Sequence, residues 1–107
     1  MYYVMAVALA GFVFTPPALA SMELSQKYEC TDCHRLELQK GQTKKKKEGP
    51  TYREIAEKYK GKKGIEKQLV DSIQKGSKGK WGKAEMDAEP DVPAKDAEAI
   101  AKWIMTQ

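Results

Sequence analysis

The sequence predicts an all-α fold of about four short helices joined by two long loops. Three segments place apolar side chains three and four residues apart, which gathers them on one face of a helix. No segment alternates apolar and polar residues as a half-buried strand would, and no internal repeat is present. The length of 107 residues fits a single domain.

Residues 1–20 carry no charged side chain and end in Ala18-Leu19-Ala20 before Ser21. A small-x-small ending after an apolar run is typical of a secretory signal cleaved after the last alanine. Because the usual basic residues at the front are missing, an uncleaved membrane anchor is the alternative. Pro16-Pro17 interrupts the run, however, and leaves it short of the ~20 apolar residues that a spanning helix needs. We therefore predict a signal peptide at 1–20 and a mature domain at 21–107.

The first helix is predicted at residues 22–29, where Leu24 and Tyr28 are four apart and share a face. Ser21 or Ser25 is expected to cap it. Residues 35–48 show no periodicity, and their glycine and run of lysines predict a solvated loop.

Three further helices are predicted at 51–59, 65–75 and 94–106. Their apolar positions are Tyr52, Ile55, Ala56 and Tyr59, then Ile65, Leu69 and Ile73, and finally Ala97, Ile100, Ala101 and Ile104. Gly61 and Gly76 follow the first two, and glycine commonly ends a helix. Residues 76–93 are rich in glycine, proline and charge, which predicts a long loop of the kind that often serves function.

Both cysteines and the single histidine lie within Cys30-Thr31-Asp32-Cys33-His34. In an exported protein this Cys-x-x-Cys-His pattern is typical of a covalently attached c-type haem. The thiols can add to the vinyl groups of the porphyrin, and the imidazole can bind the iron. A short mature chain also buries little surface on its own, and a haem would supply a large apolar core.

Three other interpretations compete with haem attachment. A structural zinc site needs four ligands, and the three Cys/His residues are packed too closely to surround one ion. A thioredoxin-like redox pair is expected beside a βαβ pattern, which is absent. A plain disulfide leaves the histidine unexplained, and its tiny loop would stabilise only weakly.

A haem that transfers electrons needs a second axial ligand, and no other histidine exists. Methionine is the available soft ligand, and His/Met ligation raises the reduction potential. Met22 is only eight residues before the first cysteine, and Met105 lies in a predicted helix, where methionine is more often core filler. Met86 lies in the long loop, 52 residues after His34, with enough chain to wrap around the haem edge. Met86 is therefore the predicted ligand.

Further motifs occur in a fixed order along the mature chain. They are Leu24 and Tyr28 before the Cys-x-x-Cys-His motif, then Gly49-Pro50-Thr51-Tyr52, Gly76-Ser77, Trp81-Gly82, Met86 and Ala101-Lys102-Trp103-Ile104. In this order the sequence resembles the short bacterial class I cytochromes c of the c-551 type. The resemblance implies a class I cytochrome c fold around one covalent haem, thioether bonds at Cys30 and Cys33, and iron ligation by His34 and Met86.

The resemblance also implies two supporting residues. The Pro50 carbonyl would accept the other ring N–H of His34, a contact that fixes the ring and raises its basicity. Trp81 would lie near a haem propionate, which suits its indole donor. The sequence departs from the family where Asp87 replaces the proline that usually follows the methionine, and where Pro93 replaces a serine-type helix cap typically worth ~1 kcal/mol.

The net charge of +4 is unevenly distributed. Residues 35–80 hold fifteen Lys/Arg and six Asp/Glu, whereas residues 85–98 hold six acidic residues and one lysine. The basic region includes Lys44, Lys45, Lys46 and Lys47, in a loop longer than the family's short form. This run is either a solvated loop or a docking patch for an acidic redox partner. Nucleic-acid binding is a poor third, because the chain is predicted to be exported.

The sequence therefore predicts a monomeric, periplasmic electron carrier that is not an enzyme. With both axial positions filled, no site is open for a substrate. The alternative is a haem enzyme or gas sensor in which Met86 is labile, and Asp87 keeps that alternative open. A third is a haem-free interaction module with a disulfide between Cys30 and Cys33.

Overall fold

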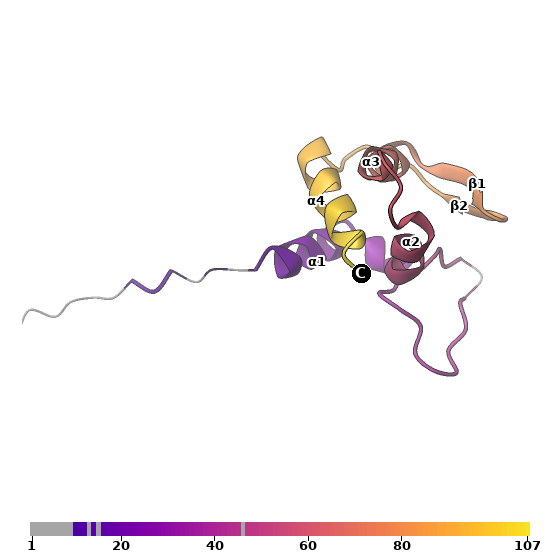
Figure 1. Ribbon diagram of the computed structural model, residues 1–107, viewed down its shortest axis with the longest axis horizontal. Helices are drawn as coiled ribbons and strands as arrows, with labels where there is room; N and C mark the ends of the chain where they lie inside the picture. Colours follow the sequence, from indigo (N-terminus) through magenta and orange to yellow (C-terminus); the bar gives the residue numbers. More distant parts are fainter. Residues whose placement is uncertain (1–9, 13, 15, 46) are drawn as a thin grey trace, which may run out of the picture.

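The computed structural model describes residues 10–12, 14, 16–45 and 47–107 (Figure 1). Its elements, in chain order, are α1 (Pro17–Lys27), a single 3-10 turn η1 (Cys30–Asp32), α2 (Tyr52–Tyr59), α3 (Ile65–Lys75), β1 (Ser77–Trp81), β2 (Ala84–Met86) and α4 (Ala94–Ile104). The four helices confirm the predicted all-α class. A small β-hairpin occupies part of the predicted second loop.

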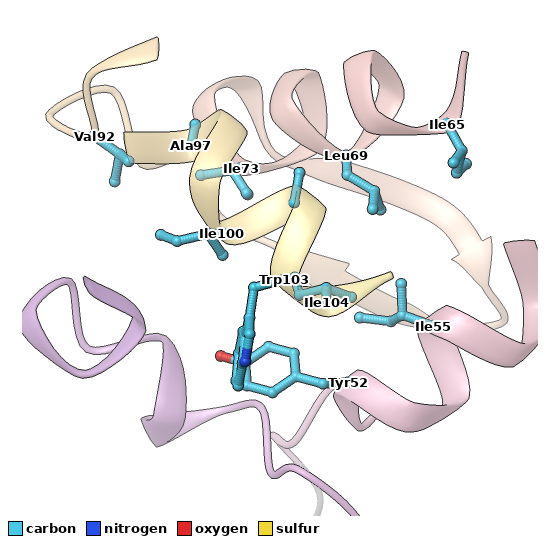
Figure 2. Packing of buried hydrophobic residues seen from close by; sticks show 11 residues of the cluster. Tyr52, Ile55, Ile65, Leu69, Ile73, Val92, Ala97, Ile100, Trp103 and Ile104 are labelled. Atoms are coloured by element: carbon cyan, nitrogen blue, oxygen red, sulfur yellow. The ribbon is translucent and has the colours of Figure 1, made fainter. Parts of the chain in front are cut away.

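The hydrophobic core lies where α4 packs against α3, α1 and α2. Figure 2 shows side chains from α2, α3 and α4 directed toward a common centre. Ala97 and Ala101 of α4 are fully buried, and their small side chains allow neighbouring elements to approach closely. Ile100 is 1% exposed, and burying a side chain of this size contributes about 1.5–3 kcal/mol.

Helix α2 begins with a reciprocal cap that fixes the start of the helix. The Thr51 hydroxyl accepts a hydrogen bond from the Glu54 amide at 3.1 Å, and the Glu54 carboxylate accepts one from the Thr51 amide at 3.1 Å. These bonds satisfy two backbone donors that the first helical turn would otherwise leave free. Thr51 is buried, so the start of α2 is held within the body of the protein.

Helix α1 differs from its predicted form. It begins at Pro17 instead of residue 22 and ends at Lys27. The expectation that Ser21 or Ser25 caps the helix is wrong, because both lie inside it and are buried. Their hydroxyls contact other elements instead: Ser21 Oγ donates to the Ala99 carbonyl at 3.4 Å, and Ser25 Oγ lies 2.5 Å from the hydroxyl of Tyr52.

The β-hairpin was not expected from the sequence. Its antiparallel register pairs Ser77 with Met86, Lys78 with Glu85 and Trp81 with Ala84, with an irregularity between Lys78 and Trp81. The apolar alternation that identifies strands is missing because most of its side chains are exposed on both faces. The predicted loop at 76–93 is therefore corrected to a hairpin followed by the connection to α4.

The described part of the N-terminal region lies outside the core. Phe12 and Phe14 are 97% and 88% exposed, and this segment extends away from the helices (Figure 1). Within the described residues, no helix is long and apolar enough to cross a membrane. The other residues of the predicted signal, 1–9, 13 and 15, are outside the described part of the chain.

Candidate functional site

The Cys-x-x-Cys-His motif forms a tight turn just after α1. The turn begins at Glu29, whose φ of 59° is the single positive φ at a non-glycine residue in the described chain. The amides of Cys33 and His34 both donate to the Cys30 carbonyl, at 3.2 and 2.9 Å. The Asp32 amide donates to the Glu29 carbonyl at 3.1 Å, so the amides of three consecutive motif residues, Asp32 to His34, are all bonded to backbone carbonyls of this turn.

The two cysteines are both free thiols, and they differ in exposure. Cys33 is exposed, whereas Cys30 is half-buried against the core. Burial raises the pKa of the Cys30 thiol, and the negative charge of Glu89 raises it further. No group of three or more His, Cys, Asp or Glu suited to a metal ion occurs among the described residues.

The imidazole of His34 is oriented by the backbone of Pro50. Its Nδ1 lies 2.7 Å from the Pro50 carbonyl oxygen, and since a carbonyl only accepts, Nδ1 carries the proton. In the neutral ring Nε2 is then the nitrogen with a free lone pair. Within the described chain no hydrogen bond engages Nε2. This is the tautomer that a histidine needs to bind a metal through Nε2.

Gly49 leaves room for the ring in this position. A Cβ at Gly49 would lie 2.9 Å from His34 Cε1 and 3.3 Å from Nδ1, both closer than normal packing allows. The Gly49 amide also donates to the Cys33 carbonyl at 2.9 Å, and the Tyr52 amide donates to the Arg35 carbonyl at 2.9 Å. The segment before α2 is therefore bonded to the segment that contains the histidine.

Tyr52 packs its ring against the imidazole. The two rings are stacked, with centroids 5.6 Å apart and an interplanar angle of 21°. Tyr52 is 3% exposed, its hydroxyl lies 2.5 Å from Ser25 Oγ, and Trp103 meets its ring edge-on at 5.1 Å. Desolvation raises the pKa of Tyr52 to about 12. The Tyr52 side chain of α2 thus contacts α1, α4 and the histidine.

Met86 and Trp81 lie apart from this cluster, in the hairpin. Both are half-buried and packed against the core. Met22 and Met105 are also half-buried there, so burial does not distinguish the three methionines. Trp81 contacts α2: Tyr59 meets it edge-on at 6.3 Å, and the Lys58 ammonium lies 4.1 Å from its ring centroid. The structure brings His34 and Pro50 together and holds Trp81 with Met86 elsewhere.

The sequence predicted the local motif and, through the resemblance, the Pro50 contact, but it did not predict the other residues that support the histidine and the hairpin. Gly49 and Tyr52 were noticed in the sequence, but their contacts with the histidine were not. The cap at Thr51 and Glu54 had a usable signal, because a threonine three residues before a glutamate often starts a helix. Lys58 gives no sequence signal, since its contacts depend on how the hairpin folds back on α2.

The donor set fits a covalently attached haem. Two free thiols lie three residues apart on one turn, and the adjacent imidazole presents an unprotonated Nε2. Thioether bonds need free thiols, and an axial ligand needs that lone pair. The hydrogen bond from Nδ1 to Pro50 is the contact that the resemblance implied.

Comparisons with known proteins agree with this arrangement. The family model described as cytochrome c matches residues 21–107. The chain is 34% identical to cytochrome c-551 of Allochromatium vinosum over 99 residues, which covers 92% of this chain and 98% of that protein. It is 35% identical to cytochrome c-552 of Hydrogenobacter thermophilus over 100 residues, covering 94% and 89%. The crystal structure of Nitrosomonas europaea cytochrome c552 superposes with a TM-score of 0.67 at 32% identity, covering 79% and 96%.

Proposed function

Because the chain belongs to the cytochrome c family, and so is an electron-transfer protein with one covalently bound c-type haem, we propose that it is a periplasmic carrier with His34 and Met86 as iron ligands. Cys30 and Cys33 would hold the haem through thioether bonds. When bound, the haem supplies an iron that changes between the ferric and ferrous states. Two permanent axial ligands would leave no position open for a substrate, so the protein is proposed not to be an enzyme.

The observation that carries the proposal is the 2.7 Å hydrogen bond between His34 Nδ1 and Pro50. It holds the proton on Nδ1 and leaves Nε2 available to an iron, while Gly49 and Tyr52 both lie against the ring. A ligand held in this way needs little rearrangement when the charge of the iron changes. That property suits rapid transfer of single electrons.

Two observations support Met86 as the second ligand. It lies in a hairpin that is mostly exposed, whereas Met22 is within α1 and Met105 is the residue that caps the end of α4. The segment that contains Met86 is also anchored to α3 at both ends, because the Gly76 amide donates to the Ser72 carbonyl and the Glu89 amide donates to the Ile73 carbonyl, each at 2.9 Å. Trp81, in the same hairpin, is proposed to lie near a haem propionate, where its indole N–H can donate.

A basic surface is proposed to dock the redox partner. Of the lysine run, Lys44 is paired with Glu54 at 2.6 Å, and Lys46 lies outside the described residues. Lys45 and Lys47 are exposed and remain candidates for contact with an acidic partner. Such charges act mainly on the association rate, so raising the salt concentration should slow electron transfer. The chain is proposed to act as a monomer.

The predicted signal at 1–20 supports a periplasmic location. The exposure of Phe12 and Phe14 is consistent with a segment that contributes nothing to the core. Cleavage after Ala20 would remove the first turn of α1, which begins at Pro17, and would keep the buried Ser21 as the new N-terminus. Mass spectrometry of protein from the periplasmic fraction should give a chain that begins at Ser21 and carries one haem.

A redox titration with visible spectra on the periplasmic protein tests the proposal. We expect one reversible one-electron transition, a low-spin spectrum in both states, and a thioether–iron charge-transfer band when the haem is oxidised. The reduced protein should not bind carbon monoxide rapidly at neutral pH. Rapid carbon monoxide binding would contradict the carrier proposal and favour a haem enzyme or gas sensor with a labile ligand.

A further inference from the structure

The hairpin that contains Met86 is mostly exposed to solvent. Of the eight residues in its strands, only Ser77, Trp81 and Met86 are half-buried, and the rest are exposed. An isolated two-stranded hairpin is marginally stable in water. The position of Met86 therefore depends on what attaches this hairpin to the helices.

The last turn of α2 provides an attachment through a single tryptophan. Tyr59 meets the Trp81 ring edge-on, with centroids 6.3 Å apart and an interplanar angle of 87°. The Lys58 ammonium lies 4.1 Å from the centroid of the same ring. An edge-on aromatic pair and a cation near an aromatic ring are both attractive arrangements.

Lys58 also binds the backbone of the hairpin. Its Nζ donates to the Lys80 carbonyl at 2.6 Å, one residue before Trp81. The same ammonium thus contacts the ring of Trp81 and a carbonyl of β1, which restrains both the side chain and the strand. Lys80 in turn reaches α3, where its Nζ donates to Ser72 Oγ at 2.9 Å.

We propose that Lys58 is a positioning residue that fastens the hairpin to α2 and so holds Met86 in place to bind the iron. The role rests on the proposed function, because it concerns Met86 as a ligand. None of the hydrogen bonds or ring contacts of Lys58 among the described residues involves Met86. It acts through Trp81 and the Lys80 carbonyl, which lie in the strand that pairs with β2.

Three substitutions separate this role from a general effect of charge. Lys58→Met removes the ammonium and keeps an unbranched side chain. Lys67→Met removes the same charge from an exposed position of α3, for which the described residues show no hydrogen bond, ion pair or ring contact. Lys58→Arg keeps the cation and should behave much like the wild type, because a guanidinium also stacks on aromatic rings and donates to carbonyls.

The first measurement is amide hydrogen exchange of the hairpin in the holoprotein. Cation–π contacts at exposed sites and exposed hydrogen bonds are each modest, so we expect about a fivefold faster exchange in Lys58→Met. Exchange in α4 should be unchanged, because local opening of the hairpin does not require the core to unfold. Equal hairpin exchange in Lys58→Met and Lys67→Met would overturn the proposal.

The second measurement is the thioether–iron charge-transfer band of the oxidised protein during denaturation. In Lys58→Met the band should disappear at a lower denaturant concentration than in the wild type, with the helical transition unmoved. If the band disappears at the same denaturant concentration in Lys58→Met as in the wild type, the positioning role of Lys58 is wrong, while Met86 ligation still stands. A wild-type protein without the band would overturn Met86 ligation, and the positioning role with it.

Discussion

The two regions that contain the proposed iron ligands are built very differently. The half-buried His34 contacts the Pro50 carbonyl, the backbone of Gly49 and the ring of Tyr52, and Tyr52 is 3% exposed. Met86 lies at the end of a mostly exposed hairpin that α2 holds through Trp81. The histidine thus contacts a core residue directly, whereas the methionine lies in a hairpin whose side chains are mostly exposed. Local opening should therefore begin at the hairpin.

The largest expected effect follows from removing the aromatic support of the histidine. Tyr52→Ala should lower the free energy of unfolding by about 3–5 kcal/mol, because it removes a buried ring from between three helices. Tyr59→Ala, which removes the half-buried ring that supports the hairpin, should cost less than half as much. Denaturant unfolding of the holoprotein followed by circular dichroism measures both. Equal costs would contradict the difference between the two regions.

A smaller effect is expected from a glycine at the base of the hairpin. Gly76 has a φ of 78°, and a Cβ there would lie 2.5 Å from the carbonyl oxygen of Met86. Gly79 has a similar φ of 77°, with no atom within 4 Å of its added Cβ. Substituting alanine at either position strains the backbone, but only Gly76→Ala also forces the strands apart. Overpacking of this kind typically lowers the free energy of unfolding by about 1–3 kcal/mol.

The readout for this pair is the thioether–iron charge-transfer band together with the free energy of unfolding. Gly76→Ala should weaken the band at room temperature, and Gly79→Ala should retain it. An intact band and equal stability in both variants would show that the close contact at Gly76 does not position the methionine.

The smallest expected effect concerns the start of α2, which both regions share. Thr51→Ala removes the side-chain cap and should cost about 1 kcal/mol. Thr43→Ala, in the exposed loop before it, should leave stability within about 0.5 kcal/mol of the wild type. Thermal unfolding of the two variants tests this, and a cost at Thr43 as large as at Thr51 would count against the cap.

Much of the fold could be predicted because helices carry their own periodic signal. The bounds of α2, α3 and α4 agree with the predicted segments to within two residues, since each has an apolar stripe facing the core. The hairpin could not be predicted in this way, because exposed strands such as β2 have no buried face to impose alternation. The start of α1 was missed because residues 17–20 were assigned to the signal.

The site residues likewise fall into those that a local sequence pattern identifies and those that depend on contacts between distant segments. Cys30, Cys33 and His34 could be identified from five consecutive residues, because thiol and imidazole chemistry depends on local spacing. Tyr52 and Lys58 depend on contacts between segments far apart in the sequence, and single-sequence patterns do not report such contacts. Met86 is intermediate: its residue type and distance from His34 were informative, but its place in a hairpin was not.

The most direct test of the account compares Met86→Ala with Met105→Ala in the oxidised holoprotein. Both variants lose one half-buried methionine, so they control for each other in packing. We predict that the thioether–iron charge-transfer band is lost in Met86→Ala and retained in Met105→Ala, while both keep the covalent haem. Loss of the band in Met105→Ala with retention in Met86→Ala would contradict the assignment of the hairpin methionine as the ligand.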